Sequence, residues 1–452
     1  MTNISKLGQE FGQYLIQLTA ELMLRSGEQP RSLSDMERSI REMLLKAGQF
    51  LLSSWLALQE SSTPTETVNC PHCAGQAGYQ FKRDGTLITL LGQVEYSRAY
   101  YLCDECQQGH YPLDQKLGLR PGQMSAELES LSGMTGVQLP FGQSSRLFER
   151  LTLVSLSDQS VAKATQAMGT EVAALEAQWL AQSQDEAWLQ EQQRVAPRPQ
   201  RLYGALDAAK VHIRGEEDDP WRDLKIGAWF TTTTKPPQQP DDDWKIEADN
   251  ISYYCDMMGS KEFSQLVWAT GCQQRAQLAD ELIFLGDGAE WIWNEVQENY
   301  PEAIQIVDWF HATEYIAPVA KAAFNAEQQQ QSWITQVRTD LWEGDLDAVI
   351  AAFNCFTDHP KAADVAQKGV TYFTNNRHRM DYPTYRANGY QIGSGTIESG
   401  CKQIVTQRLK VAGAIWEQSN AVKTAKARAA FLSDQWDVIT SRREHLGLPL
   451  AA

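Results

Sequence analysis

Residues 281–311 read ELIFLGDGAEWIWNEVQENYPEAIQIVDWFH and indicate the fold class of the second half of the chain. LIFLG is a short apolar run, typical of a buried strand, and it ends at Asp287. WIWNEVQENYP predicts a helix, and AIQIVDWFH predicts another buried strand. Upstream, RLYGALDAAKVHI from residue 201 and LKIGAWFTTTT from residue 224 are β-rich, and a helix is expected between them and LIFLG. The order β-β-α-β-α-β favours a mixed α/β sheet.

Three carboxylates stand at informative places in this pattern. Asp207 lies in the first strand, Asp287 directly follows a buried strand, and Glu398 begins a helix behind the glycine turn at 393–395. Active sites of α/β folds gather at the carboxyl edge of the sheet. Three carboxylates brought together there are suited to two Mg²⁺ or Mn²⁺ ions, which such sites hold about 3.5–4 Å apart. Spacing alone equally allows helix caps and turn formers at these positions.

Longer blocks of sequence carry more information than single acids. They are GDGAEWIWN (286–294), NYPEAIQIVDWFHATEY (299–315) and YQIGSGTIESGCKQIVTQRLK (390–410), with TGVQLPFGQSSRLFERLTLVSLS (135–157) and two cysteine pairs. Together these blocks resemble insertion-sequence transposases of the ISKra type, in the wider Mutator-like DDE group, over most of residues 70–436. The resemblance implies an RNase H-like domain in which Asp207, Asp287 and Glu398 bind the catalytic metal ions. It also implies cleavage and strand transfer on DNA, at element ends and at a target.

The same resemblance implies an α-helical insertion between the second Asp and the Glu. The sequence pattern agrees, because residues 312–376 have helical sequence without a strand signal. We therefore expect a catalytic domain over 201–436 with a helical insertion at about 312–390.

Asp308 and His311 form a D-x-x-H motif similar to one that follows the second catalytic Asp in Mutator-like and hAT transposases. His311 is a candidate catalytic residue that would contact the scissile phosphate, with Asp308 orienting it. The alternative is a buried Asp–His hydrogen bond that only holds the end of the strand. The sequence leaves both open.

The first 190 residues predict three further parts. Two amphipathic helices are expected over 1–60, with Ser34 and Glu37 as a capping box for the second. A zinc ribbon is expected over 68–112, because CPHC and CDEC supply two thiolate pairs separated by β-rich sequence; the ligands are Cys70, Cys73, Cys103 and Cys106. We expect the nearby His110 to lie on the surface. Residues 122–190 look helical, and a DNA-binding helix-turn-helix and a plain scaffold both fit.

The chain has 452 residues and a formal net charge of −17, which is unusual for a nucleic-acid-binding protein. Local charge differs from the total, since residues 371–430 hold nine Lys or Arg against three acids. We expect phosphate contacts from four of these basic residues, namely Lys402, Arg408, Lys410 and Arg428. A solvated helix face is the alternative.

The sequence has no run of eighteen apolar residues and no signal-peptide pattern, so we expect a cytoplasmic protein without a membrane partner. The fold class expected overall is multidomain α+β. Joining two DNA ends favours a homodimer or larger assembly in the active complex. A non-catalytic DNA-binding protein derived from a transposase and an RNase H-like nuclease are the competing functions.

Overall fold

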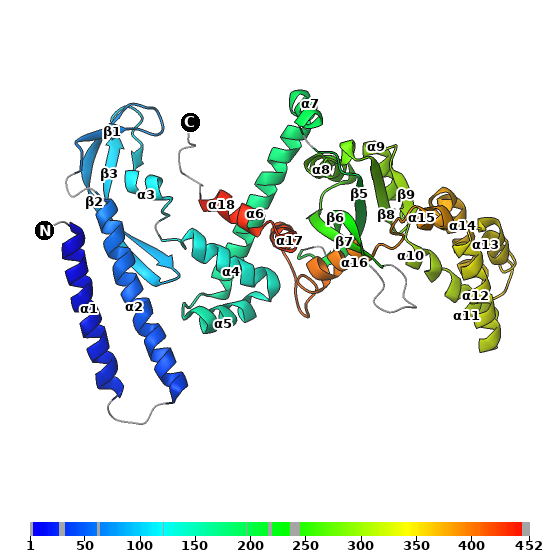
Figure 1. The fold of residues 1–452 in the computed structure, drawn as a ribbon, viewed down its shortest axis with the longest axis horizontal. Coiled ribbons are helices and arrows are strands. Elements are labelled where there is room, and N and C mark those ends of the chain that lie inside the picture. The colour runs from blue at the N-terminus through cyan, green and yellow to red at the C-terminus, as the bar shows by residue number, and fades with distance from the viewer. Residues whose placement is uncertain are drawn as a thin grey trace. The chain divides into compact units, whose positions relative to one another are not determined.

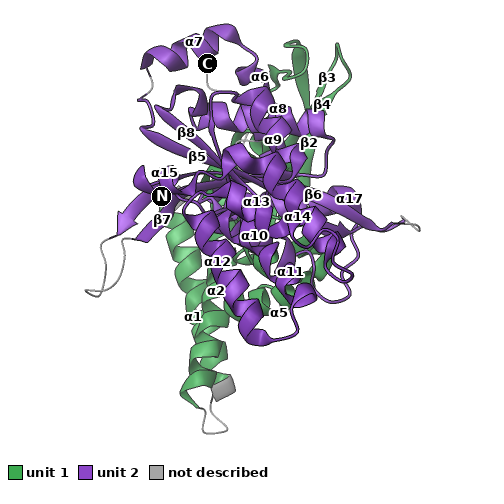
Figure 2. Cartoon of the chain, turned by 90° about the vertical axis from the view of Figure 1, so that its right-hand side faces the viewer, with its two compact units in different colours: residues 1–171, 437–452 green, residues 172–436 purple. Residues whose placement is uncertain are grey.

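The computed structural model describes residues 3–26, 32–60, 64–120, 122–195, 197–215, 219–235 and 245–444. It is a mixed α+β chain with two separate β-sheets (Figure 1). The chain divides into two compact units, coloured in Figure 2. We call residues 1–171 with 437–452 the N-terminal unit, and residues 172–436 the central unit.

The N-terminal unit begins with a helical hairpin. α1 (Asn3–Ser26) and α2 (Leu33–Gln59) pack through aromatic rings, with Phe50 at 4.8 Å from Tyr14 between ring centroids. The predicted capping box is displaced by two residues. Ser32, and not Ser34, caps α2 by accepting a hydrogen bond from the backbone nitrogen of Asp35. Both serines of SLSD stand three residues before an acid, and the structure uses the first, whose hydroxyl also donates to the Asp35 carboxylate at 2.7 Å.

A four-stranded antiparallel sheet follows in the order β1-β2-β3-β4. Its strands are β1 (Thr67–Asn69), β2 (Gln76–Thr89), β3 (Gly92–Cys103) and β4 (Gly109–His110). One end of the β2–β3 hairpin packs on α2, where Leu56, Leu87 and Val94 share a buried cluster with α3 (Pro112–Leu117). The other end carries the four cysteines.

Helices complete the N-terminal unit. α4 (Ala126–Gln138), α5 (Phe141–Thr152) and the start of α6 (Asp158–Ser183) share a buried apolar cluster, and α18 (Trp436–Glu444) contacts α4 and α6. Ser157 caps α6 by accepting from the nitrogen of Ser160, and Val161 is fully buried. The C-terminal α18 is fixed by an ion pair of 2.6 Å between Arg443 and Glu129. After α6, α7 (Glu186–Val195) leads into the sheet of the central unit.

The central unit is built on a five-stranded sheet with the order β7-β6-β5-β8-β9. β5 (Arg201–His212), β6 (Trp221–Lys235) and β7 (Lys245–Asp256) run antiparallel, whereas β8 (Glu281–Gly286) and β9 (Ile304–Val307) join β5 in parallel. α8 (Ser260–Gln273) and α9 (Glu290–Asn299) make the crossovers to the two parallel strands.

Two features of this sheet differ from the predicted order. β7 was not predicted, because its first half is an exposed edge rich in acids and Asn, which are depleted in strands. The expected strand AIQIVDWFH ends at Val307, and α10 (Trp309–Glu314) begins at once. The buried side chain of Asp308 caps that helix, so the apolar residues after it pack as a helix face.

Beyond β9, every regular element up to residue 394 is helical within the described stretch 245–444. After α10 these are α11 (Ile316–Ala323), α12 (Glu327–Trp342), α13 (Leu346–Asn354), α14 (Ala363–Asn376) and α15 (Tyr382–Ala387), with a short 3₁₀ turn after α14. α16 (Gly395–Cys401) and α17 (Gln418–Leu432) then return to the sheet. None of the helices in the described ranges combines the length and apolar composition needed to cross a membrane.

A buried ion cluster fixes α17 to the sheet. The ammonium of Lys426 is 3% exposed and lies 2.8 Å from Asp256 at the end of β7. It also pairs with the buried Glu176 of α6 and donates to the carbonyl of Cys255. Three charges therefore share one interior site, which is stable only while all three are present.

Candidate active site and metal centre

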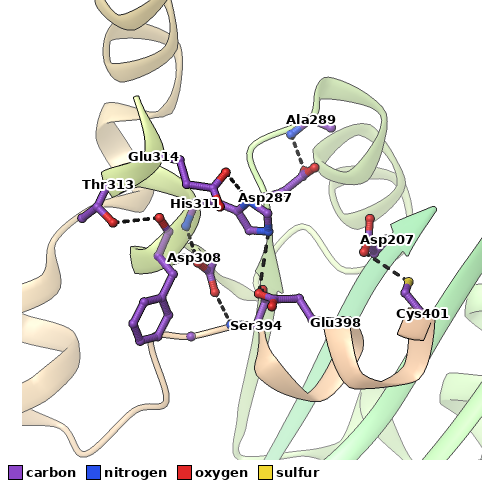
Figure 3. A network of polar contacts seen from close by, with 12 residues as sticks. Asp207, Asp287, Ala289, Asp308, His311, Thr313, Glu314, Ser394, Glu398 and Cys401 are labelled. Carbon is purple, nitrogen blue, oxygen red and sulfur yellow. Dashed lines mark hydrogen bonds and ion pairs between the residues drawn. The ribbon is translucent and has the colours of Figure 1, made fainter. Parts of the chain in front are cut away.

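Three aspartates occupy one level across the parallel strands of the central sheet. Ala205 of β5 pairs with Leu285 of β8, and each lies two residues before an aspartate, Asp207 and Asp287. Gly286 pairs with Val307 of β9, one residue before Asp287 and Asp308. Neighbouring strands are about 4.8 Å apart, so the sheet itself brings these acids into a row at its carboxyl edge. Figure 3 shows this edge from close by.

Asp308 is the fully buried member of the row, and both of its oxygens are occupied. Oδ1 accepts from the backbone nitrogen of His311 at 2.6 Å, and Oδ2 accepts from the backbone nitrogen of Ser394. The nitrogen of Trp309 also donates to the carbonyl of Ile392 at 2.9 Å. The end of β9 thereby holds the glycine turn that precedes α16.

Glu398 projects from the first turn of α16 toward this edge (Figure 3). Its Oε1 accepts from the hydroxyl of Ser394 at 2.8 Å and lies 3.7 Å from Nε2 of His311. The other ring nitrogen of His311 lies 3.6 Å from Glu314. The imidazole of His311 therefore lies between two carboxylates, and its contact with Asp308 is made through the backbone.

Asp207 is half-buried next to a thiol. Its Oδ2 accepts from Sγ of Cys401 at 3.2 Å, and its Oδ1 accepts from the nitrogen of Ala208 at 2.7 Å. Burial, followed by the negative charge of Asp287, raises the pKa of Asp207, and the hydrogen bonds from Cys401 and Ala208 oppose the rise. A cation at this edge would offset both the burial and the repulsion.

Asp287 is held by a turn and by a tyrosine. Its Oδ1 accepts from the nitrogen of Ala289 at 2.8 Å, and its carbonyl accepts from the hydroxyl of Tyr372 at 2.8 Å. Gly288 has φ +97°, and a Cβ there would lie 2.6 Å from the Tyr372 ring, so the turn requires glycine. A cavity of about 350 Å³ opens beside Asp287, with His311 and Lys368 in its lining.

The arrangement differs from the predicted triad in one respect. Within the described chain, the ligand atoms of Asp308, His311 and Glu398 lie within 4.8 Å of one another, whereas Asp207, Asp287 and Glu398 are not so close a group. All of these residues were predicted from the sequence, but Ser394, Cys401 and Tyr372, which fix the positions of the carboxylates, were not. A single serine, thiol or tyrosine carries no sequence signal of that role, and the partners of Cys401 and Tyr372 lie far away in the chain.

The four cysteines come together at one end of the N-terminal sheet. Sγ of Cys70 lies 3.6 Å from that of Cys106, and Sγ of Cys73 lies 3.5 Å from that of Cys103. All four sulfurs lie within 4.8 Å of one another. A tetrahedral Zn²⁺ with Zn–S bonds of about 2.3 Å separates its sulfurs by about 3.8 Å, so the cluster fits a structural zinc ion.

The two cysteine turns have the same backbone. The backbone nitrogen of Ala74 donates to the carbonyl of Cys70, and in the same way the nitrogen of Gln107 donates to the carbonyl of Cys103. Both donor residues have a left-handed φ, 60° for Ala74 and 56° for Gln107. The nitrogens of Cys70 and Cys103 donate to the carbonyls five residues on. Two copies of one turn, facing each other, aim four sulfurs at one point.

His110 is not on the surface as expected. It is 5% exposed, and burial lowers its pKa. It lies in β4, whose pairing with β3 places its ring 6.0 Å from that of Tyr101. The short pairing of β4 with β3, which the sequence does not reveal, buries the ring.

Two of the four predicted phosphate contacts in the basic segment 371–430 are buried. Arg408 is 1% exposed and Arg428 is 4% exposed, and Arg428 donates to the carbonyl of Gln403. Arg408 lies over the ring of Trp416, and at this burial neither arginine can contact phosphate in this conformation. Lys402 and Lys410 are exposed, so only these two of the four remain candidates.

A comparison of the chain with models of protein families finds no match, and neither does a comparison with curated proteins.

Proposed function

We propose that the chain is a DNA transposase of the DDE type, with an RNase H-like core formed by the central unit. The observation that carries the proposal is the level row of Asp207 and Asp287 on adjacent parallel strands, with Glu398 on a helix held at the same edge. The strand order, three antiparallel strands followed by two parallel ones, suits that core. The helices α10–α15 are then the insertion between the second Asp and the Glu.

The donor set fits divalent cations of the Mg²⁺ class. All three side chains offer hard carboxylate oxygens, and the raised pKa of Asp207 reflects unrelieved burial and charge. Two-metal sites distribute their ligands around ions about 3.5–4 Å apart, so the three carboxylates need not form one tight group. The ions would activate a water or 3′-hydroxyl and stabilise the leaving 3′-oxygen.

The other residues of the edge then have positioning roles. Asp308 keeps the turn before α16 in place, and Ser394 directs one oxygen of Glu398. His311, a third exposed, stands beside Glu398 where a phosphate oxygen of the substrate would accept a hydrogen bond. Because two element ends are joined, we expect at least two protomers in the active complex. The four-cysteine ribbon would hold zinc as a structural ion.

The test is cleavage of DNA that spans the chain's own gene and both flanks, with Mg²⁺ or Mn²⁺. We expect metal-dependent nicking near the element ends, followed by joining of 3′-hydroxyl ends to a target plasmid. Asp287→Ala should abolish both steps. Asp280→Ala is the matched control, because Asp280 is an exposed acid just before the opposite end of β8.

Each alternative function gives a different result. Nicking without joining by wild-type protein would identify a nuclease. Binding without nicking would identify a non-catalytic DNA-binding protein. Equal nicking by wild type and Asp287→Ala would refute the assigned site.

A further inference from the structure

A groove in the N-terminal unit gathers exposed arginines. It measures about 880 Å³ and is lined by the first turns of α2 and the second half of α5. Four arginines are in its lining, Arg38 and Arg41 from α2 and Arg146 and Arg150 from α5. Two glutamates, Glu37 and Glu149, are the acids of the lining, so the groove has a formal charge of +2 in a chain of −17.

The two walls of the groove are joined by one of these arginines. The guanidinium of Arg41 donates to the carbonyl of Leu151 at the end of α5. Arg38, Arg146 and Arg150 are exposed, and within the described ranges they form no ion pair or hydrogen bond. Three guanidinium groups are therefore available to an outside ligand, on a surface whose two sides are already fixed.

The spacing places these groups in register along the groove. Arg146 and Arg150 are four residues apart on one face of α5, which separates their Cβ atoms by about 5–6 Å. Arg38 lies on the other wall of the groove, on α2. Arginine forks suit phosphate oxygens, and several arginines along one groove suit a polymer of phosphates.

From this geometry we infer that the groove between α2 and α5 binds the phosphate backbone of duplex DNA. The inference rests on the proposed function for the identity of the anion. The sequence predicted phosphate contacts in the basic segment 371–430, where Arg408 and Arg428 are buried. The inferred contact lies instead in the N-terminal unit. α5 lies in the segment where a helix-turn-helix was considered, but this contact uses backbone phosphates and does not require base reading.

The test measures binding of the full chain to a fluorescent duplex of arbitrary sequence over a range of salt concentrations. The slope of log K against log salt falls by about 0.9 for each phosphate that the protein no longer neutralises. Arg146→Gln with Arg150→Gln should reduce the slope by about 1.8 and weaken binding roughly 10- to 100-fold near 0.1 M salt. Arg38→Gln, on the other wall, should reduce it by about 0.9.

Arg194→Gln with Arg338→Gln is the matched control, since both are exposed arginines on helices of the central unit and the change in net charge is the same. This control should leave the slope unchanged. A groove variant that melts at the wild-type temperature but keeps the wild-type slope would overturn the inference and leave the proposed function standing. A wild-type chain that binds no duplex at low salt would refute both.

Discussion

The contact between Asp308 and the turn before α16 gives the sharpest test of how the candidate site is held. Asp308→Asn keeps the shape of the side chain but leaves one acceptor oxygen for two backbone donors, the nitrogens of His311 and Ser394. Whichever way the amide is turned, one buried N–H loses its partner. An unsatisfied buried donor costs about 1–3 kcal/mol. We expect that cost to fall on the end of β9 and the turn at 393–395.

Hydrogen exchange measured by mass spectrometry is the appropriate assay, because a chain with two units need not unfold in one step. A local loss of about 1–3 kcal/mol speeds exchange roughly 5- to 150-fold in peptides covering 391–400. Asp345→Asn is the matched control. Asp345 caps α13 with one exposed hydrogen bond, to the nitrogen of Ala348 at 3.0 Å, and Asn caps helices as well as Asp does.

Equal exchange of residues 391–400 in the two variants would refute the view that Asp308 positions the turn that carries Glu398. A rise confined to Asp308→Asn would support it. The same protein should then bind Mn²⁺ more weakly at the site, because the carboxylate of Glu398 would no longer be held in one place.

Three further outcomes are expected. The purified chain should contain about one zinc ion, counted by mass spectrometry. Cys73→Ser should remove this ion and the ribbon structure with it. Cys355→Ser, at an exposed cysteine outside the cluster, should leave the metal content unchanged. Burial raises the pKa of Glu295, so the folded chain binds the carboxyl proton more tightly than the unfolded chain does. The folded state therefore loses stability as the pH rises through the raised pKa. Glu295→Gln should increase the melting temperature at pH 8, by an amount that shrinks toward pH 4. Lys426→Ala removes the cation shared by the buried Glu176 and the partly buried Asp256 and should destabilise the central unit by about 3–5 kcal/mol, seen as a lower urea midpoint, whereas the exposed Lys261→Ala should change it little.

The strands that build the edge of the sheet were predictable because burial leaves a simple pattern. LIFLG is a continuous apolar run and the strand from residue 201 is mostly apolar, and the structure makes them the neighbours β8 and β5. The cysteine pairs were equally clear, since thiolates in two short turns have few other uses. β7 was not predicted because its first half is an exposed edge held by pairing with β6. Pairing between strands leaves no local signal in the sequence.

Charge was the least predictable feature from sequence. The cluster of basic residues around Glu398 suggested a DNA surface, but Arg408, Lys426 and Arg428 are interior groups held by the tertiary fold. The sequence does not predict a basic groove that contains Arg38 and Arg146, because these residues are 108 positions apart. Only the packing of α5 beside α2 places them in the same groove. Net charge and charge per segment count residues, whereas binding depends on which of them reach the surface together.

The three aspartates of the row show how one residue type acquires different roles at one level of a sheet. Asp308 is fully buried, and each of its oxygens accepts a hydrogen bond from a backbone nitrogen, so it holds the end of β9 against the turn before α16. Asp207 and Asp287 each accept a hydrogen bond from a backbone nitrogen one or two residues on, and each is only partly buried. Their remaining acceptor capacity and mutual repulsion make a cation the partner that best completes them. The proposed division between one positioning aspartate and two ligand aspartates rests on burial and on the number of backbone donors each receives, and the Asp308→Asn and Asp287→Ala variants should fail in different assays.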